Sequence, residues 1–202
     1  MEVKHEVVDG MAYTWVNGVK GTLRQIDYEI LKSLALDIPR GGIYVETGSY
    51  MGCSAVAVGL HARGGVRVYA HDIWVRDMEE LVAEGAPPPR EEDYFYKFYK
   101  GVRDNGLTDT IIPIRGDSKW SLGIHEDESV DVAFVDGDHS YEGALGDLQV
   151  LWSKMKPGAP VVIHDSNMEP VMKAVKEFAQ GKKLDVRGFH GTDMLMITKE
   201  EM

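Results

Sequence analysis

The chain has 202 residues, of which 44% are hydrophobic and 27% charged, a composition typical of one globular domain. Its 22 lysines and arginines stand against 33 aspartates and glutamates, and the net charge of −11 argues against non-specific binding to nucleic acid or to an anionic membrane. The single cysteine, Cys53, excludes an intramolecular disulfide and a thiolate metal cluster. We find no signal peptide and no apolar run near the roughly 18 residues of a membrane span, so we expect a cytoplasmic protein.

The first 40 residues are predicted to form an extension that caps the main part of the domain. Residues 3–16 alternate between apolar and polar side chains around a turn at residues 9–10, which indicates a β-hairpin. Thr22 and Gln25 then fit a capping box, and apolar residues follow at helical spacing until Pro39. We therefore expect a hairpin followed by a helix that opens at Thr22.

From residue 42 onward, short apolar runs alternate with helical patterns. This alternation predicts an α/β fold, a doubly wound parallel sheet with helices on both faces. Two further runs near the C-terminus are separated by too few residues for a helical crossover, so we expect them to pair antiparallel at or near an edge of the sheet. The predicted strands cover residues 43–45, 66–70, 110–114, 130–135, 160–163, 184–189 and 194–198.

Residues 73–105 interrupt this alternation and are interpreted as an insertion-like segment. The segment contains three prolines at 87–89 and then the aromatic run 94–99. Phe98 and Val102 lie on one helical face, which predicts a crossover helix after the second strand, enlarged by a lid-like loop. The aromatic run could also line an acceptor pocket or form a contact in a homodimer.

Each of the first five strands of this sheet ends in polar or acidic residues. In an open parallel sheet these carboxyl ends meet at one rim, where ligands bind. Aspartate and glycine also follow strands simply as turn residues, but the whole set favours a binding site over that explanation. The strand ends are Glu46, Asp72, Asp117, Asp136 with Asp138 and His139, and His164 with Asp165.

The loop after the first of these strands has the spacing Glu46-x-Gly48-x-x-x-Gly52. Gly48 allows the chain to turn as it leaves the strand, and Gly52 allows close packing or close approach of a ligand where the helix starts. The amide groups of that helix start can hold a carboxylate. An acid replaces the first glycine of the dinucleotide fingerprint, which favours a cationic or hydrogen-bond-donating ligand group over a pyrophosphate.

The next two strand ends suggest contacts to a nucleoside. Asp72 stands where an acid typically accepts hydrogen bonds from ribose hydroxyls, although it could instead cap the following segment. Asp117 could accept a hydrogen bond from an exocyclic amine, and Ser118 could serve the ligand or be a helix N-cap.

The densest group of reactive side chains follows the fourth strand. His139 lies beside several carboxylates, which favour its charged form, and it can act as a general base near neutral pH. Asp136 and Asp165 end neighbouring strands, and two converging carboxylates can hold Mg²⁺ or bind a substrate amine. Asp138 could instead cap the helix that begins near Ser140.

Taken together, these residues resemble the class I S-adenosylmethionine-dependent methyltransferases. Within that superfamily the chain is most similar to the small-molecule O-methyltransferase branch related to macrocin and rhamnosyl O-methyltransferases. The resemblance covers roughly residues 40–199. The stretches that carry it are VETGSYMGCSAVAVG (45–59), VYAHDIW (68–74), IRGDS (114–118), VDVAFVDGDHSYEGALGDL (130–148) and LWSKMKPGAPVVIHD (151–165).

The resemblance implies a Rossmann-like, seven-stranded, mostly parallel sheet with an antiparallel last strand. It implies that Glu46 and the loop 48–52 hold the methionine part of S-adenosylmethionine, that Asp72 binds the ribose, and that Asp117 with Ser118 bind the adenine. The full cofactor-binding set that it implies is Glu46, Gly48, Ser49, Tyr50, Gly52, Ser54, Asp72, Ile73, Gly116, Asp117, Ser118 and Asp136.

The resemblance also bears on catalysis. In metal-dependent relatives such as catechol O-methyltransferase, the acid at the position of Asp136 and an Asp-Asn pair after the fifth strand bind Mg²⁺. Asp165 matches the aspartate of that pair, but Ser166 replaces the asparagine, and His139 stands where those relatives carry a lysine base. The implied mechanism is in-line methyl transfer to an oxygen, with His139 as the base and with Asp136 and Asp165 orienting it or holding Mg²⁺.

The residues alone leave three other functions open. A nicotinamide-dependent oxidoreductase would bind NAD(H), and the acid in the glycine loop argues against it. A non-catalytic module would bind S-adenosylmethionine without transferring its methyl group, and a metal-dependent hydrolase would need no cofactor. For the main hypothesis we expect a small-molecule acceptor bordered by Trp15 and Trp74, and we expect the remaining histidines, including His125, to be ordinary surface or turn residues.

Overall fold

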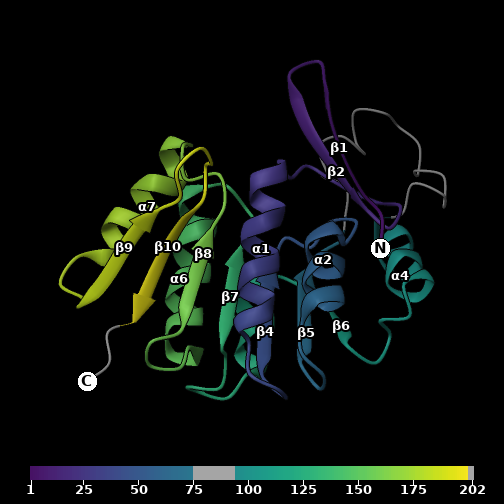
Figure 1. The fold of residues 1–202 in the computed structure, drawn as a ribbon. Helices are drawn as coiled ribbons and strands as arrows, with labels where there is room; N and C mark the ends of the chain where they lie inside the picture. The colour runs from purple at the N-terminus through teal and green to yellow at the C-terminus, as the bar shows by residue number, and fades with distance from the viewer. Residues whose placement is uncertain (75–93, 200–202) are drawn as a thin grey trace, which may run out of the picture.

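The computed structural model describes residues 1–74 and 94–199, and it contains a central seven-stranded sheet between two layers of helices (Figure 1). The strand order is β6-β5-β4-β7-β8-β10-β9. Strands β4 to β8 pair in parallel, and β10 runs antiparallel to both of its neighbours, which confirms the predicted fold. The strands are β4 (Ile43–Thr47), β5 (Arg67–Asp72), β6 (Ile111–Arg115), β7 (Val132–Val135), β8 (Pro160–Ile163), β9 (Leu184–Gly188) and β10 (Leu195–Lys199).

The central strands are apolar on both faces because helices cover both. Tyr44 and Phe134 belong to one buried cluster, and Val45 and Ala133 belong to a second cluster on the opposite side of the sheet. Helices α1 (Gln25–Asp37), α2 (Cys53–His61) and α4 (Tyr94–Asp104) pack on the first side, while α6 (Tyr141–Lys154) and α7 (Glu169–Ala179) pack on the second (Figure 1). A short helix α5 (Ser118–Ser121) and the 3₁₀ turn η2 (Leu122–Ile124) follow β6.

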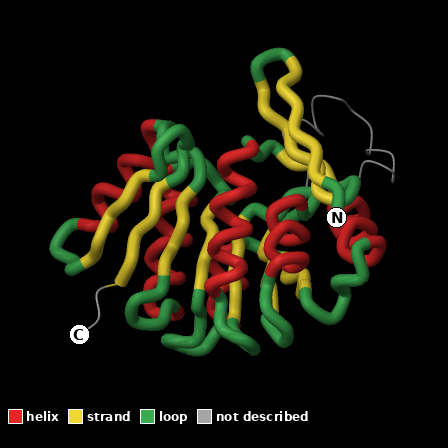
Figure 2. The backbone as a smooth tube through the Cα atoms, in the orientation of Figure 1, coloured by secondary structure: helices red, strands yellow, loops and turns green. Residues whose placement is uncertain are grey.

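The N-terminal residues form a small separate sheet whose hairpin projects from the body of the molecule (Figure 2). Strands β1 (Val3–Val8) and β2 (Met11–Val16) confirm the predicted hairpin, and a short third strand, β3 (Val19–Gly21), was not predicted. The predicted capping box at Thr22 is wrong. Pairing of Thr14 with Gly21 keeps the chain extended to that point, so α1 begins only after Arg24, whose backbone N–H donates to Asp27.

The insertion-like segment is described only in part. Helix α4 is the expected crossover helix, with Phe98 and Val102 buried against the core. The three prolines and the expected lid-like loop, residues 75–93, lie outside the described residues. Among the helices that the structure does describe, none combines the length and the apolar character needed to cross a bilayer.

Candidate active site

The carboxyl ends of the parallel strands surround a cavity of about 610 Å³. Eight residues of the predicted cofactor set line it, so the folding brings together positions from four separate loops. A slightly larger groove between α1 and the strands β8 and β10 lies away from this rim and contains none of the predicted site residues. The eight lining residues are Gly48, Tyr50, Asp72, Ile73, Gly116, Asp117, Ser118 and Asp136.

The other four residues of the predicted set, which include Glu46, do not line the cavity. Glu46 ends β4 beneath the glycine loop with only 1% of its surface exposed. The Tyr44 hydroxyl donates to one carboxylate oxygen at 3.3 Å, while the other oxygen has no hydrogen-bond partner among the described residues. Burial raises the pKa of Glu46 from 4.5 to about 7. The buried or packed residues of this layer are Glu46, Ser49, Gly52 and Ser54.

The buried Glu46 carboxyl makes the stability of the apo protein pH-dependent. The unfolded chain releases this proton near pH 4.5 and the folded chain near pH 7, so folding stability falls as the pH rises through that range. We expect Glu46→Gln to be more stable than the parent by up to roughly 3 kcal/mol at pH 8, and the gain to shrink towards pH 4.5. Urea unfolding at several pH values measures this, and an equal gain at pH 8 and pH 4.5 would contradict it.

Two glycines shape the loop above Glu46. Gly48 has a φ of +80°, and a Cβ atom there would lie 1.9 Å from the carbonyl oxygen of Asp136. Gly52 has a φ of +89°, and its Cβ would lie 2.8 Å from the ring of Phe98. Both glycines therefore combine a left-handed turn with close packing, and Gly48 lets β4 and β7 end at the same rim.

Asp72 ties two parts of the rim together. Its carboxylate accepts hydrogen bonds from the backbone N–H of Tyr50 at 2.7 Å and of Trp74 at 2.6 Å, and the Trp74 indole donates to the Tyr50 carbonyl at 2.8 Å. Tyr50 and Trp74 both have positive φ values, so this tie stabilises backbone that would otherwise be strained. Each Asp72 oxygen keeps a further lone pair, and the side chain lines the cavity, so it can cap and also bind a ligand. Trp74 lines the cavity as well, whereas Trp15 is not among the described lining residues.

At the β6 end of the cavity, Asp117 rather than Ser118 is the N-cap of α5. The Asp117 side chain accepts from the backbone N–H of Lys119 at 2.9 Å. The N-cap interpretation of Ser118 is therefore wrong. Its hydroxyl instead donates at 2.5 Å to Asp147, a buried carboxylate on α6. Asp147 was missed because helical periodicity gives no sign that this residue faces the cavity floor.

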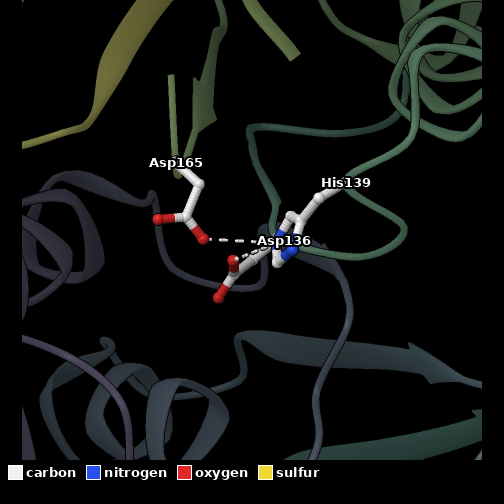
Figure 3. Close-up of side chains that lie close together, drawn as sticks. All are labelled: Asp136, His139 and Asp165. Carbon is white, nitrogen blue, oxygen red and sulfur yellow. Dashed lines mark hydrogen bonds and ion pairs between the residues drawn. The ribbon is translucent and has the colours of Figure 1, made fainter. Parts of the chain in front are cut away.

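Asp136, His139 and Asp165 converge at the β7 and β8 ends of the rim, as predicted (Figure 3). The Nε2 atom of His139 lies 3.4 Å from Asp136 Oδ1 and 3.2 Å from Asp165 Oδ2. The hydrogen bond with Asp136 raises the pKa of His139 above its usual value and outweighs the effect of burial. His139 is 39% exposed and lines the cavity, so its ring can reach a bound molecule. Asp138 bonds to Ser140, the N-cap of α6, as the capping interpretation expected.

A second histidine, His164, completes this cluster from behind. Its Nδ1 atom lies 3.2 Å from Asp136 Oδ1 and also 3.2 Å from Asp165 Oδ2, and its Nε2 atom lies 3.5 Å from an Asp27 carboxylate oxygen. Burial alone would lower the pKa of His164, but the three carboxylates raise it to about 12. Asp27, at the start of α1, is held by Arg24 and Thr192, and these hydrogen bonds together with His164 keep its pKa well below the usual range despite burial.

His71 and His125 form a buried pair that the sequence analysis did not foresee. Their Nε2 atoms lie 2.9 Å apart, and His71 Nδ1 lies 2.8 Å from the Ser121 hydroxyl. The expectation that His125 is an ordinary surface residue is therefore wrong, because α5 and η2 fold its loop against β5. Burial lowers the pKa of His71 to about 3 and that of His125 to about 4, so one neutral ring donates to the other.

This neutral pair predicts acid sensitivity. The unfolded chain protonates these rings near pH 6.5 while the folded chain does not, so stability falls as the pH drops from 6.5 towards 4. We expect His125→Gln to flatten the pH dependence of the free energy of unfolding in this range. Denaturant titrations at pH 7, 6, 5 and 4.5 test this against the exposed control His190→Gln. If both variants retain the parent slope, the pair does not contribute to acid unfolding.

A doubly wound sheet of this strand order, with its only reversed strand next to the edge and a cavity at the carboxyl ends, defines a class I S-adenosylmethionine-dependent methyltransferase. Residues 45–166 match the family model described as a methyltransferase domain, and the chain belongs to this family. No curated protein sequence matches the chain.

Solved structures share the fold at low sequence identity. The O-methyltransferase NovP aligns with a TM-score of 0.69 and 18% identity, over 90% of this chain and 82% of that chain. Cofactor-bound Rv0187 from MTB aligns with a TM-score of 0.67 and 16% identity, over 89% and 82%. A methyltransferase from Geobacter sulfurreducens aligns with a TM-score of 0.64 and 16% identity, over 89% and 80%. At these identities the likeness concerns the fold.

Proposed function

We propose that this enzyme transfers the methyl group of S-adenosylmethionine to a hydroxyl oxygen of a small molecule, with His139 as the general base. The observation that carries this proposal is the placement of His139 in the cavity wall between two carboxylates. The bound cofactor supplies a methyl group already activated by its sulfonium. The protein then has to align the two reactants and accept one proton.

The proton balance assigns a task to each side chain of the cluster. As the acceptor oxygen forms its bond to the methyl carbon and the carbon–sulfur bond breaks, the hydroxyl proton passes to neutral His139. Asp136 and Asp165 stabilise the imidazolium that results, because each has an oxygen within 3.4 Å of Nε2. The likeness to the structure described as the O-methyltransferase NovP agrees with an oxygen acceptor, but it supports the fold more directly than the substrate.

For the cofactor, we propose the contacts that the strand ends suggest. Asp72 accepts from the ribose hydroxyls, Asp117 and Ser118 contact the adenine, and the loop 48–52 with Glu46 beneath it holds the methionine part. The shared cavity supports these roles for the lining residues. The unpartnered Glu46 oxygen is an acceptor that a cationic ligand group could satisfy.

Calorimetric titration with S-adenosylhomocysteine tests this assignment. We expect Asp72→Ala to weaken binding by roughly 1.5–3 kcal/mol or more, because it removes a charge-assisted acceptor and also frees the Tyr50 and Trp74 amides. Asp138→Asn, which changes a carboxylate at the other end of the cavity, is the matched control and should bind as the parent does. Heat with NAD⁺ but not with S-adenosylhomocysteine would support the oxidoreductase alternative and overturn the proposal.

A divalent cation is the remaining part of the proposal. Asp136, His139 and Asp165 each offer one ligand atom, and these atoms lie within 4.8 Å of one another. Such a cation, when bound, would lower the pKa of the acceptor hydroxyl. The donor set fits a cation in general but suits Mg²⁺ poorly, because Mg²⁺ takes oxygen ligands in octahedral geometry and two imidazole rings face these carboxylates.

A further inference from the structure

The buried face of the catalytic cluster contains an imidazole without a hydrogen-bond partner. His164 has only 8% of its surface exposed, and neither ring nitrogen forms a hydrogen bond of good geometry with any described residue. Its Nδ1 atom nevertheless faces the gap between Asp136 Oδ1 and Asp165 Oδ2, at 3.2 Å from each. A buried polar atom in that position requires a partner, and a proton or a metal ion can provide one.

The spacing of these three atoms matches the ligands of a small divalent ion. Ligand bonds of about 2.0–2.2 Å place neighbouring ligand atoms roughly 3.0–3.4 Å apart. Both distances from His164 Nδ1 fall in that range. The opposite nitrogen, Nε2, lies 3.5 Å from Asp27, and metal-bound imidazoles commonly direct their second N–H to a carboxylate in this way.

Asp27 is itself firmly placed for such a role. Its two oxygens accept from the Thr192 hydroxyl at 2.6 Å and from the Arg24 backbone N–H at 2.8 Å, and the side chain is 1% exposed. It cannot swing towards the solvent to satisfy another partner. The orientation of the His164 ring is therefore fixed from the first turn of α1, far from the cavity itself.

We propose that Asp136, Asp165 and His164 Nδ1 form a site for a transition-metal ion such as Mn²⁺, Fe²⁺, Co²⁺ or Zn²⁺, in preference to Mg²⁺. This inference rests on the cation in the proposed function and makes its ligands and metal class specific. Imidazole nitrogen suits these ions, whereas Mg²⁺ favours oxygen. The two histidines then divide the work, because buried His164 cannot reach an acceptor, while His139 lines the cavity and stays available for the proton.

The experiment uses the full chain after removal of metal with a chelator. Calorimetry with Mn²⁺, Zn²⁺ and Mg²⁺ measures affinity, and the visible absorption of Co²⁺ reports nitrogen ligation without any assay of activity. We expect one ion per chain, with Mg²⁺ at least about tenfold weaker than Mn²⁺ or Zn²⁺. His164→Gln should weaken Co²⁺ by about tenfold or more and change its spectrum, and Asp27→Asn should weaken it by about tenfold.

The matched control is His139→Gln, which should weaken Co²⁺ less than His164→Gln does. Absence of binding by every ion would overturn the inference and leave His164 as an imidazolium between carboxylates. Equal affinity for Mg²⁺ and Mn²⁺, or parent-like binding by His164→Gln, would also overturn it. If His164→Gln does not fold by circular dichroism, Asp165→Asn takes its place and must weaken Co²⁺ to the same extent. S-adenosylhomocysteine is titrated into the same samples, because its binding without metal binding rejects this inference alone.

Discussion

Replacing Gly48 by alanine is expected to destabilise the protein by at least about 3 kcal/mol and to abolish cofactor binding. A methyl group at this position would lie 1.9 Å from the carbonyl oxygen of Asp136 and 2.7 Å from the Cα atom of Gly137. Both contacts are with backbone, which cannot rotate away as a side chain could. The ends of β4 and β7 would have to separate, and the loop that we assign to the methionine part of the cofactor would move with them.

Gly10→Ala is the control for Gly48→Ala, because Gly10 has nearly the same φ, +81°, with no atom within 4 Å of the added methyl group. It measures the backbone cost alone, which is about 1 kcal/mol. Urea unfolding gives both free energies, and calorimetry with S-adenosylhomocysteine gives both affinities. Equal destabilisation by the two substitutions would show that the close approach of β4 and β7 does not matter.

The second large effect concerns catalysis. We expect His139→Gln to lower methyl transfer by roughly 10²–10⁴-fold, the usual contribution of a general base, while the affinity for S-adenosylhomocysteine stays within about threefold of the parent. Glutamine keeps the approximate size of the ring and its ability to hydrogen-bond to Asp136, but it cannot take a proton at neutral pH. Transfer of labelled methyl from S-adenosylmethionine to a panel of hydroxyl and amine acceptors measures the rate and identifies the accepting atom.

Asp138→Asn is the internal comparison for this experiment. Asp138 neighbours His139 and lines the same cavity, but its carboxylate bonds to Ser140 at the start of α6. We expect it to keep activity within a few-fold of the parent. Parent-like rates for His139→Gln would reject His139 as the base, and methyl transfer to amines alone would reject the oxygen acceptor.

The cation and the base are chemically linked in this arrangement. The oxygens of Asp136 and Asp165 that face His139 Nε2 also face His164 Nδ1. Any charge placed between the carboxylates on the His164 side therefore changes how well they stabilise a protonated His139. Metal titration and methyl transfer consequently have to be measured on the same preparations.

The sequence by itself determined the sheet, its strand polarity and the side of the sheet that carries the site. These follow from local signals, because apolar runs buried on both faces mark the strands and acidic residues mark their ends, as at Asp72 and Asp136. The antiparallel last strand followed from the short connection before it, which leaves no room for a helix. The convergence of His139 with Asp136 was predictable because only two residues separate them on one loop.

Only the tertiary structure decided which side chains support those residues. His164 meets Asp27 across 137 positions of the chain, and His71 meets His125 across 54, contacts that no periodicity encodes. The same reason explains the start of α1, where pairing of β3 with β2 overrode a plausible local cap at Thr22. Local pattern fixes an element and the direction in which it ends, whereas the charge of a buried imidazole depends on which carboxylates the packing brings against it.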